Sequence, residues 1–253
     1  MSNALEFQIS ARYGKTPVLH EVACTIAPGQ IVALVGLSGS GKSTLALALL
    51  RLLHYRGGEV TGSIKVAGTE LTGLSERGMR GVRGKLIGYV PQSPGTALNE
   101  RLRVRTLLQE TWAAHAAGPG SFRTLLESVQ LPADQAFLDK RAGELSTGQG
   151  QRLLIALGIM HKPAVLLADE PTSALDVITQ AAVLKLFAEL NQKNGTAMLF
   201  ISHDLLSVAS ISHRVDILHD GRIVESGPPD QIFQQPRHPF TQELVNAMPH
   251  RAF

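Results

Sequence analysis

The most constraining feature of the chain is a glycine-rich loop between an apolar run and a helical pattern. The run IVALVG occupies residues 31–36, and GLSGSGKST occupies residues 36–44. Glycines at these positions allow successive backbone N–H groups to turn toward one anion at the N-terminus of a helix. The pattern G-x-x-x-x-G-K-[ST], with a strand before it and a helix after it, therefore predicts a loop that binds phosphate.

Within this loop, two side chains have specific expected roles. Lys42 would reach the β- and γ-phosphates of a nucleotide, and the hydroxyl of Ser43 would bind Mg²⁺. A plain glycine–serine loop is the alternative, but the flanking strand and helix favour the phosphate-binding interpretation. The residues expected to bind nucleotide here are Gly36, Ser38, Gly39, Ser40, Gly41, Lys42, Ser43 and Thr44.

Composition bounds the class of protein. The chain has 253 residues, of which 44% are hydrophobic, and a net charge of +3. This length suits one large domain or a domain with a subdomain, and the mild basicity favours anionic ligands without demanding nucleic acid. The single cysteine, Cys24, excludes an internal disulfide and indicates a reducing compartment. The longest apolar stretch, residues 45–53, is too short to span a bilayer.

Apolar runs alternate with helical patterns along most of the chain. A helix is expected from Lys42 to about Leu53, directly after the glycine-rich loop. Strands that alternate with helices predict an α/β fold with a mostly parallel sheet covered on both faces. The buried-strand patterns lie at residues 31–36, 86–92, 164–171 and 196–204.

The middle of the chain has a different texture. Residues 94–161 are helical in pattern and have polar joints, and they contain no buried-strand run. We therefore expect a single domain over residues 1–253, in which residues 1–93 and 162–253 form the core and residues 94–161 form an inserted helical subdomain.

Two adjacent carboxylates follow a buried-strand run in VLLADEP, residues 165–171. Asp169 is placed to hold a metal ion, and Glu170 to act as a base or to polarise water. Solvated acids at a strand end are the alternative interpretation. With a phosphate-binding loop upstream, the pair favours nucleotide hydrolysis over nucleotide binding alone.

Three single residues are candidates for a functional role only because the phosphate-binding loop and the acidic pair are present in the same chain. His203 follows the strand pattern of FISHD and could sense a γ-phosphate, although a lone histidine there would ordinarily be a surface residue. Gln92 follows another strand end, at the edge where open α/β sheets bind ligands, and is a candidate ligand of Mg²⁺ or water. Tyr13, in ARYG, would by default be a packing residue.

The stretch ELSTGQGQR, residues 144–152, predicts the start of a helix. Ser146 can serve as N-cap, and Gln149 can complete a capping box. Gly148 and Gly150 nevertheless fall in the first turns, where each costs about 1 kcal/mol relative to alanine. Some close approach at this helix end is therefore expected.

Taken in order, these motifs resemble the ATP-binding subunits of ABC transporters over nearly the whole chain. The resemblance implies a RecA-like P-loop NTPase fold with an antiparallel β region. The matching motifs are an A-loop aromatic at Tyr13, Walker A at 36–44, a Q-loop at Gln92, the signature at 145–149, Walker B at 165–170, the D-loop SALD at 173–176 and the H-switch at His203.

The resemblance also implies roles for these residues. Tyr13 would stack on adenine, and Gln92 would couple the nucleotide site to membrane subunits. Glu170 would polarise the attacking water, and Asp176 would line the interface between two such subunits. Residues of the signature, Ser146, Gly148 and Gln149, would contact the ATP bound by the partner subunit.

The same resemblance implies partners and a location. ATP and Mg²⁺ would be the cofactors, and a second ATP-binding subunit, identical or a paralogue, would complete the site. Two integral-membrane permease subunits and an extracytoplasmic substrate-binding protein would complete an importer. The chain would lie peripherally on the cytoplasmic face of the inner membrane, without nucleic acid.

A narrower resemblance points to the branch that imports oligopeptides, dipeptides and nickel or metal chelates. It rests on VPQSPGTALN at 90–99 and on HPFTQELVNAMP at 238–249, although the latter could be a generic amphipathic helix. Many peptide-import relatives carry a longer cysteine-bearing C-terminal extension. Since this chain ends at Phe253 with only Cys24, we expect no iron–sulfur cluster.

The signature departs from the family pattern LSGGQ at two points. Thr147 stands in place of the first glycine, and Gly150 follows Gln149 where a polar residue is usual. A β-branched side chain where phosphate should approach closely could weaken this half-site.

Two other classes of function fit the sequence less well. A soluble ABC-type ATPase acting on DNA or ribosomes would be expected to have tandem cassettes or long heptad arms, which the sequence lacks. A P-loop kinase would not need the signature, and a GTPase should carry an N-K-x-D motif, which is absent. The basic runs are interpreted as solvated surface rather than as a nucleic-acid site, and the second could contact a permease; they are Arg77, Arg80, Arg83 and Lys85, and Arg101, Arg103 and Arg105.

Overall fold

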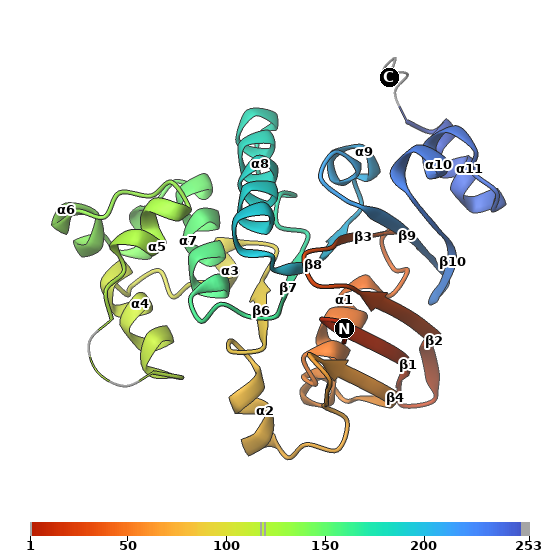
Figure 1. Ribbon diagram of the computed structural model, residues 1–253, viewed down its shortest axis with the longest axis horizontal. Helices are drawn as coiled ribbons and strands as arrows, with labels where there is room; N and C mark the ends of the chain where they lie inside the picture. The colour runs from red at the N-terminus through yellow and green to blue at the C-terminus, as the bar shows by residue number, and fades with distance from the viewer. Residues whose placement is uncertain (1, 117, 119, 249–253) are drawn as a thin grey trace.

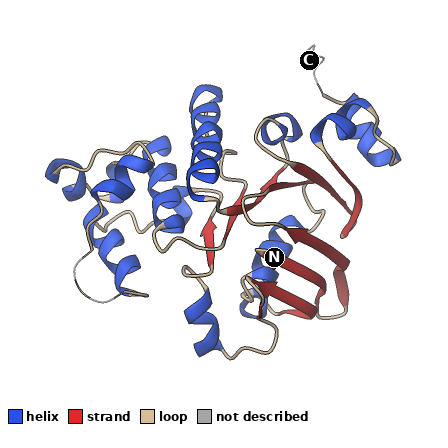
Figure 2. Ribbon diagram, in the orientation of Figure 1, coloured by secondary structure: helices blue, strands red, loops and turns tan. Residues whose placement is uncertain are grey.

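The computed structural model describes residues 2–116, 118 and 120–248 and arranges their strands in two sheets (Figures 1 and 2). The six-stranded sheet has the order β10-β9-β3-β8-β7-β6, and the four-stranded sheet has the order β2-β1-β4-β5. The strands are β1 (Leu5–Tyr13), β2 (Thr16–Ile26), β3 (Ile31–Val35), β4 (Gly58–Val66), β5 (Thr69–Glu70), β6 (Ile87–Val90), β7 (Val165–Asp169), β8 (Ala197–Ser202), β9 (Arg214–His219) and β10 (Arg222–Gly227).

The helices cover both faces of the larger sheet, as Figure 1 shows. They are α1 (Lys42–Leu49), α2 (Glu76–Val82), α3 (Pro94–Ala97), α4 (Val104–Ala113), α5 (Arg123–Ser128), α6 (Gln135–Asp139), α7 (Thr147–Ile159), α8 (Val177–Asn194), α9 (Leu205–Ala209), α10 (Pro229–Gln234) and α11 (Pro239–Asn246), with the 3₁₀ helices η1 (Leu53–Arg56) and η2 (Ala142–Glu144).

The predicted parallel sheet is confirmed. The four buried-strand patterns form β3, β6, β7 and β8, which pair in parallel. The four-stranded sheet is antiparallel, as the resemblance implied. Strands β9 and β10 were not predicted, because Arg214 and Asp216 interrupt the apolar pattern of β9. These two residues form an ion pair with an N–O distance of 2.9 Å, in which Asp216 is buried and Arg214 is partly buried.

The larger sheet separates two hydrophobic clusters. Leu166 and Ala168 of β7 face the cluster formed with α7, α8 and the helical segment. Val165 and Leu167, on the opposite face, pack with α1, α2 and the antiparallel sheet. This alternation follows from the two-residue period of a strand, and burial on both faces explains the continuously apolar runs in the sequence.

The segment between β6 and β7 is helical, and it lies on the left of Figure 1. Its helices α4, α5 and α7 contribute Val104, Leu108, Leu126 and Leu153 to the same cluster as β7. The segment is therefore packed against the sheet by apolar contacts.

The helix expected from Lys42 to about Leu53 is shorter than predicted. It ends at Leu49, and Arg51 adopts a positive φ of 53°. In this conformation Arg51 Nη1 donates hydrogen bonds to the carbonyl oxygens of Leu71 and Leu74, at 2.6 and 2.8 Å. These tertiary hydrogen bonds stabilise the left-handed residue that terminates the helix.

The first basic run is also less solvated than predicted. Arg83 is mostly buried and makes two hydrogen bonds with Glu76, at 2.6 and 3.1 Å. Its Nε donates to the carbonyl oxygen of Leu50, and its Nη2, which also donates to Glu76, donates to the carbonyl oxygen of Arg51. Arg80, in contrast, is exposed as expected. Arg83 is therefore a structural residue that joins α2 to the end of α1.

Candidate nucleotide site

The glycine-rich loop connects β3 to α1 with the expected geometry. Gly39 and Gly41 have φ values of 86° and 105°, in the region that favours glycine. At Gly36 the constraint is space, because an added Cβ would lie 2.4 Å from the carbonyl oxygen of Leu218. Two of these glycines thus permit the loop conformation, and the third permits close packing on β9.

Lys42 lies over this loop. Its Nζ donates hydrogen bonds to the carbonyl oxygens of Gly36 and Leu37, at 2.8 and 3.0 Å. The same atom lies 3.7 Å from Oε1 of Glu170, and its side chain is 5% exposed. The ammonium group therefore sits between the loop and the end of β7.

The carboxylate of Glu170 is the point at which the predicted residues meet. Gln92 Nε2 donates a hydrogen bond to Glu170 Oε2 at 3.3 Å, and His203 Nδ1 lies 3.1 Å from the same oxygen. Glu170 has a φ of 47°, which is uncommon for a residue other than glycine and typical of residues held in place at functional sites. Its N–H donates to the carbonyl oxygen of Ile201, which ties the end of β7 to β8.

Beside it, Asp169 ends β7 and is almost fully buried. Burial raises the pKa of Asp169, and the hydroxyl of Tyr89, which donates to Asp169 Oδ2 at 3.3 Å, opposes that rise. Burial also raises the pKa of the Tyr89 phenol. Tyr89 was not predicted as a site residue, although its place three residues before Gln92, at the end of β6, was the available signal.

Ser173 is a second residue that sequence reasoning did not assign. Its Oγ accepts a hydrogen bond from Gln92 Nε2 at 3.1 Å and donates one to the carbonyl oxygen of Glu170 at 3.1 Å. It lies in SALD, the motif in which only Asp176 had been given a role. A cavity of about 90 Å³ is lined by Ser173, Glu170 and His203, among others, and it has room for water.

The start of α7 has the predicted capping box. Ser146 Oγ accepts from the N–H of Gln149, and Gln149 Oε1 accepts from the N–H of Ser146, both at 3.2 Å. Among the described residues, no hydrogen bond or ion pair joins Ser146, Gly148 or Gln149 to the loop at 36–44. The two glycines meet other parts of the same chain. A Cβ on Gly148 would lie 2.9 Å from Thr179, and one on Gly150 would lie 2.8 Å from Pro94.

Asp176 and Tyr13 lie outside the cluster around Glu170. Asp176 caps α8 by accepting from the N–H groups of Ile178 and Thr179, and the hydroxyl and N–H of Thr179 lower the pKa of this carboxyl. Tyr13 ends β1 and packs beside Gly58, where an added Cβ would lie 3.0 Å from its ring. Neither contact, by itself, assigns a ligand.

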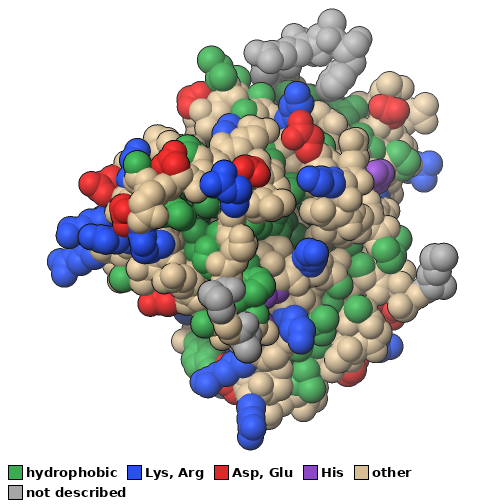
Figure 3. Space-filling model, turned by 60° about the vertical axis from the view of Figure 1, so that its left-hand side comes forward, with side chains coloured by type: hydrophobic (Ala, Val, Ile, Leu, Met, Phe, Trp, Pro, Cys, Tyr) green, Lys and Arg blue, Asp and Glu red, His purple; other side chains and the backbone are tan. Residues whose placement is uncertain are grey.

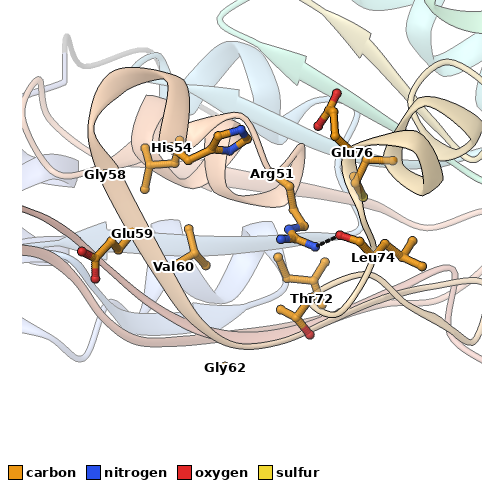
Figure 4. A pocket seen from close by; sticks show the side chains of 12 residues that line it. Arg51, His54, Gly58, Glu59, Val60, Gly62, Thr72, Leu74 and Glu76 are labelled. Carbon is orange, nitrogen blue, oxygen red and sulfur yellow. Dashed lines mark hydrogen bonds between the residues drawn. The ribbon is translucent and has the colours of Figure 1, made fainter.

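Two arginines of the second basic run are paired with an acid. Arg103 and Arg105 both contact Asp139, and on the face seen in Figure 3 basic side chains lie among acidic and hydrophobic ones. A separate cavity of about 470 Å³ lies between η1, β4 and the start of α2 (Figure 4). Its lining includes Arg51, His54 and Glu76, and it shares none of the predicted site residues.

Comparison with known proteins identifies the family. The family model described as ABC transporter matches residues 19–173, which is more than half of the chain. The chain belongs to the ABC transporter family. It is therefore an ATP-binding cassette ATPase. Within the described residues, no helix of this cassette combines the length and apolar composition that crossing a bilayer requires.

Relatives and a solved structure agree with this assignment. The dipeptide transport ATP-binding protein DppD of Escherichia coli is 37% identical over 236 residues, covering 91% of this chain and 72% of DppD. A putative peptide import ATP-binding protein of Brucella ovis is 41% identical over 244 residues, with the same coverages. The structure of cbiO1 from Clostridium perfringens, part of the transporter complex cbiONQ, has a TM-score of 0.79 at 24% identity and covers 93% of this chain and 92% of cbiO1. The last likeness shows the fold.

Proposed function

We propose that this chain is the ATP-hydrolysing subunit that powers a peptide importer. The observation that carries the catalytic part is the convergence of Gln92, His203 and Lys42 on the carboxylate of Glu170. Relatives named for dipeptide and peptide import, at 37% and 41% identity, support peptides as the cargo. Nickel or metal chelates are the alternative cargo, from the narrower sequence resemblance.

In the proposed reaction, the loop at 36–44 holds the phosphates and Lys42 neutralises the γ-phosphate. Glu170 polarises the attacking water, for which the small cavity beside its carboxylate has room. His203, which lines the same cavity, would hydrogen-bond the γ-phosphate, and Tyr13 would stack on adenine. Gln92 would orient the water and couple nucleotide binding to the membrane subunits.

Magnesium fits the oxygen donors at this site. The carboxylate of Asp169, the hydroxyl of Ser43 and the amide oxygen of Gln92 are ligand types that Mg²⁺ prefers. Asp169 and Glu170 are adjacent acids at the end of a buried strand, so a divalent cation would relieve their mutual repulsion. Bound magnesium would neutralise charge on the phosphates during hydrolysis.

The proposal includes a second cassette. Ser146, Gly148 and Gln149 make no described hydrogen bond to the phosphate loop of their own chain, which supports a role toward ATP on a partner subunit. Asp176 would lie at the interface between the two. Thr147 is exposed at the same helix end, so a half-site with reduced activity is part of the proposal.

The remaining partners follow from an import function. We assign residues 1–93 and 162–253 to the nucleotide-binding core and residues 94–161 to a helical subdomain that docks one of two permease subunits. An extracytoplasmic substrate-binding protein would deliver the peptide. The cassette would then lie on the cytoplasmic face of the membrane as a peripheral subunit.

Reconstitution tests this function. The chain would be expressed with candidate permease subunits and a binding protein, purified, and assayed in vesicles for ATP-dependent uptake of dipeptides, longer peptides and nickel chelates. We expect co-purification with the membrane subunits and peptide uptake that Glu170→Gln abolishes. Uptake of nickel chelates without peptide uptake would contradict the cargo, and co-purification with ribosomes or nucleic acid instead of permeases would contradict the transporter.

A further inference from the structure

Gly150 is the place where α7 packs directly on α3. It is buried, and its φ is not in the left-handed region, so its backbone conformation does not require glycine. A Cβ at this position would lie 2.8 Å from Cβ and 3.2 Å from Cγ of Pro94. The absence of a side chain is therefore explained by the close approach of Pro94.

Pro94 belongs to the segment that carries Gln92. It is the first residue of α3 and is buried, two residues after Gln92. On the other side of Gln92, the carbonyl oxygen of Pro91 accepts a hydrogen bond of 3.5 Å from Nε2 of Gln151, a residue that is 1% exposed. Successive residues of α7, Gly150 and Gln151, thus hold the chain on both sides of Gln92.

From this segment, the side chain of Gln92 reaches the carboxylate of Glu170. Gln92 Nε2 lies 3.3 Å from Glu170 Oε2 and 3.1 Å from Ser173 Oγ. We propose that Gly150 is a positioning residue, whose close packing on Pro94 sets the distance between Gln92 and Glu170. This inference rests on the proposed function, in which Gln92 acts at the site of hydrolysis.

A single added methyl group tests this contact. Gly150→Ala would push Pro94 and its segment away from α7, so ATP turnover should fall by about tenfold to a hundredfold, as expected for misplacement of a group near the reacting atoms. The dissociation constant for ATP should change less than about twofold, because no hydrogen bond or ion pair among the described residues joins the loop at 36–44 to α3. Unchanged turnover would overturn the proposal.

Gly95→Ala is the matched control. Gly95 lies in the same helix α3, is exposed, and an added Cβ would have Ser93 Oγ, at 4.0 Å, as its nearest neighbour. It introduces the same change of residue without the collision, so turnover should equal that of the parent chain. A loss of turnover equal to that of Gly150→Ala would show that any change in this region disturbs the site and would overturn the specific contact.

A double-mutant cycle separates positioning from general destabilisation. If Gly150 acts through Gln92, then Gly150→Ala added to Gln92→Ala should lower turnover by less than about twofold more. An undiminished further loss in the Gln92→Ala background would contradict the proposal, because the effect would then bypass Gln92.

Removing the opposing side chain provides a rescue. Pro94→Gly removes both atoms that the new methyl group would meet, so Gly150→Ala with Pro94→Gly should regain the turnover and thermal stability of Pro94→Gly alone. This comparison stays informative if Gly150→Ala alone does not fold, and failure of rescue would overturn the contact.

Throughout, Glu170→Gln serves as the reference for the proposed function. If Glu170→Gln hydrolyses ATP normally, the proposed function is wrong. If Glu170→Gln loses ATP turnover while Gly150→Ala keeps it, only the positioning role of Gly150 is rejected.

Discussion

His203 Nδ1 lies 3.1 Å from Glu170 Oε2, the oxygen that also accepts the hydrogen bond from Gln92. The three residues follow β8, β7 and β6, which are neighbours in the parallel sheet. Parallel strands bring their carboxyl ends to one edge, so residues more than a hundred positions apart in sequence meet there. The contact between His203 and Glu170 is thus a direct product of the sheet order.

His203→Ala should lower ATP turnover by about tenfold to a hundredfold, because it removes a group positioned beside the carboxylate that we propose polarises water. The dissociation constant for ATP, measured by titration calorimetry, should stay within about twofold of the parent value. His54→Ala is the control, since His54 is exposed and lines the separate cavity of Figure 4. Equal turnover for both variants would reject a role for His203.

Tyr89→Phe should raise the magnesium concentration that gives half-maximal ATP hydrolysis by about tenfold. The hydroxyl of Tyr89 donates to Asp169 and opposes the rise in its pKa that burial causes, and such outer partners typically tune the affinity of metal ligands by this much. A magnesium titration of the ATPase rate measures the shift. Tyr55→Phe, at a side chain that is 64% exposed, should leave the titration unchanged. An identical titration for Tyr89→Phe would contradict the assignment of Asp169 as a metal ligand.

Glu70 should contribute to stability in a pH-dependent way. Although burial raises its pKa, hydrogen bonds from Ser63, Thr72 and the N–H of Ile64 lower the pKa to about 2, from a model-compound value of 4.5. A lowered carboxyl pKa stabilises the fold above the unfolded value and loses that effect as pH falls from 4.5 toward 2.

Chemical denaturation at several pH values measures this effect. Glu70→Gln should reduce the free energy of unfolding at neutral pH by about 1 kcal/mol, a figure discounted for solvent screening at this exposed site. The difference from the parent chain should shrink toward pH 2. Glu243→Gln, an exposed change on α11, should show no such trend. A difference that does not depend on pH would exclude the hydrogen-bonded carboxylate as its cause.

Cys24 should be inert toward thiol reagents in the folded protein. Burial raises the pKa of the Cys24 thiol, and the nearby carboxylate of Asp216 raises it further, so little thiolate forms. Alkylation followed by mass spectrometry should label Cys24 at mildly alkaline pH only in denaturant. Rapid labelling of the native chain would contradict the burial of Cys24 and its 3.0 Å contact with Arg214 Nη2.

Most residues of the candidate nucleotide site could be identified from the sequence because they belong to local patterns. An apolar run followed by glycines, or by two acids, marks the end of a buried strand without knowledge of the rest of the fold. Tyr89 and Ser173 were missed because their roles come from hydrogen bonds to Asp169 and Gln92 that cross between strands.

Other features required tertiary information for the same reason. The end of α1 depends on hydrogen bonds from Arg51 to a distant loop, and β9 contains an ion pair that hides its strand pattern. The sequence raised the question of the glycines at the start of α7, but their neighbours, Thr179 and Pro94, belong to other helices. Helix propensity gives the energetic cost of these glycines, but it does not explain why glycine occupies the two positions.

Glu170→Gln tests the proposed hydrolysis most directly. The amide is nearly the same size as the carboxylate, so ATP affinity should stay within about twofold, while the turnover rate should fall by at least about a hundredfold because water is no longer polarised. Glu189→Gln, at an exposed glutamate of α8, should hydrolyse ATP at the parental rate. The Glu170→Gln chain should bind ATP without turning it over, and hydrolysis by that chain at the parental rate would show that Glu170 does not polarise the attacking water.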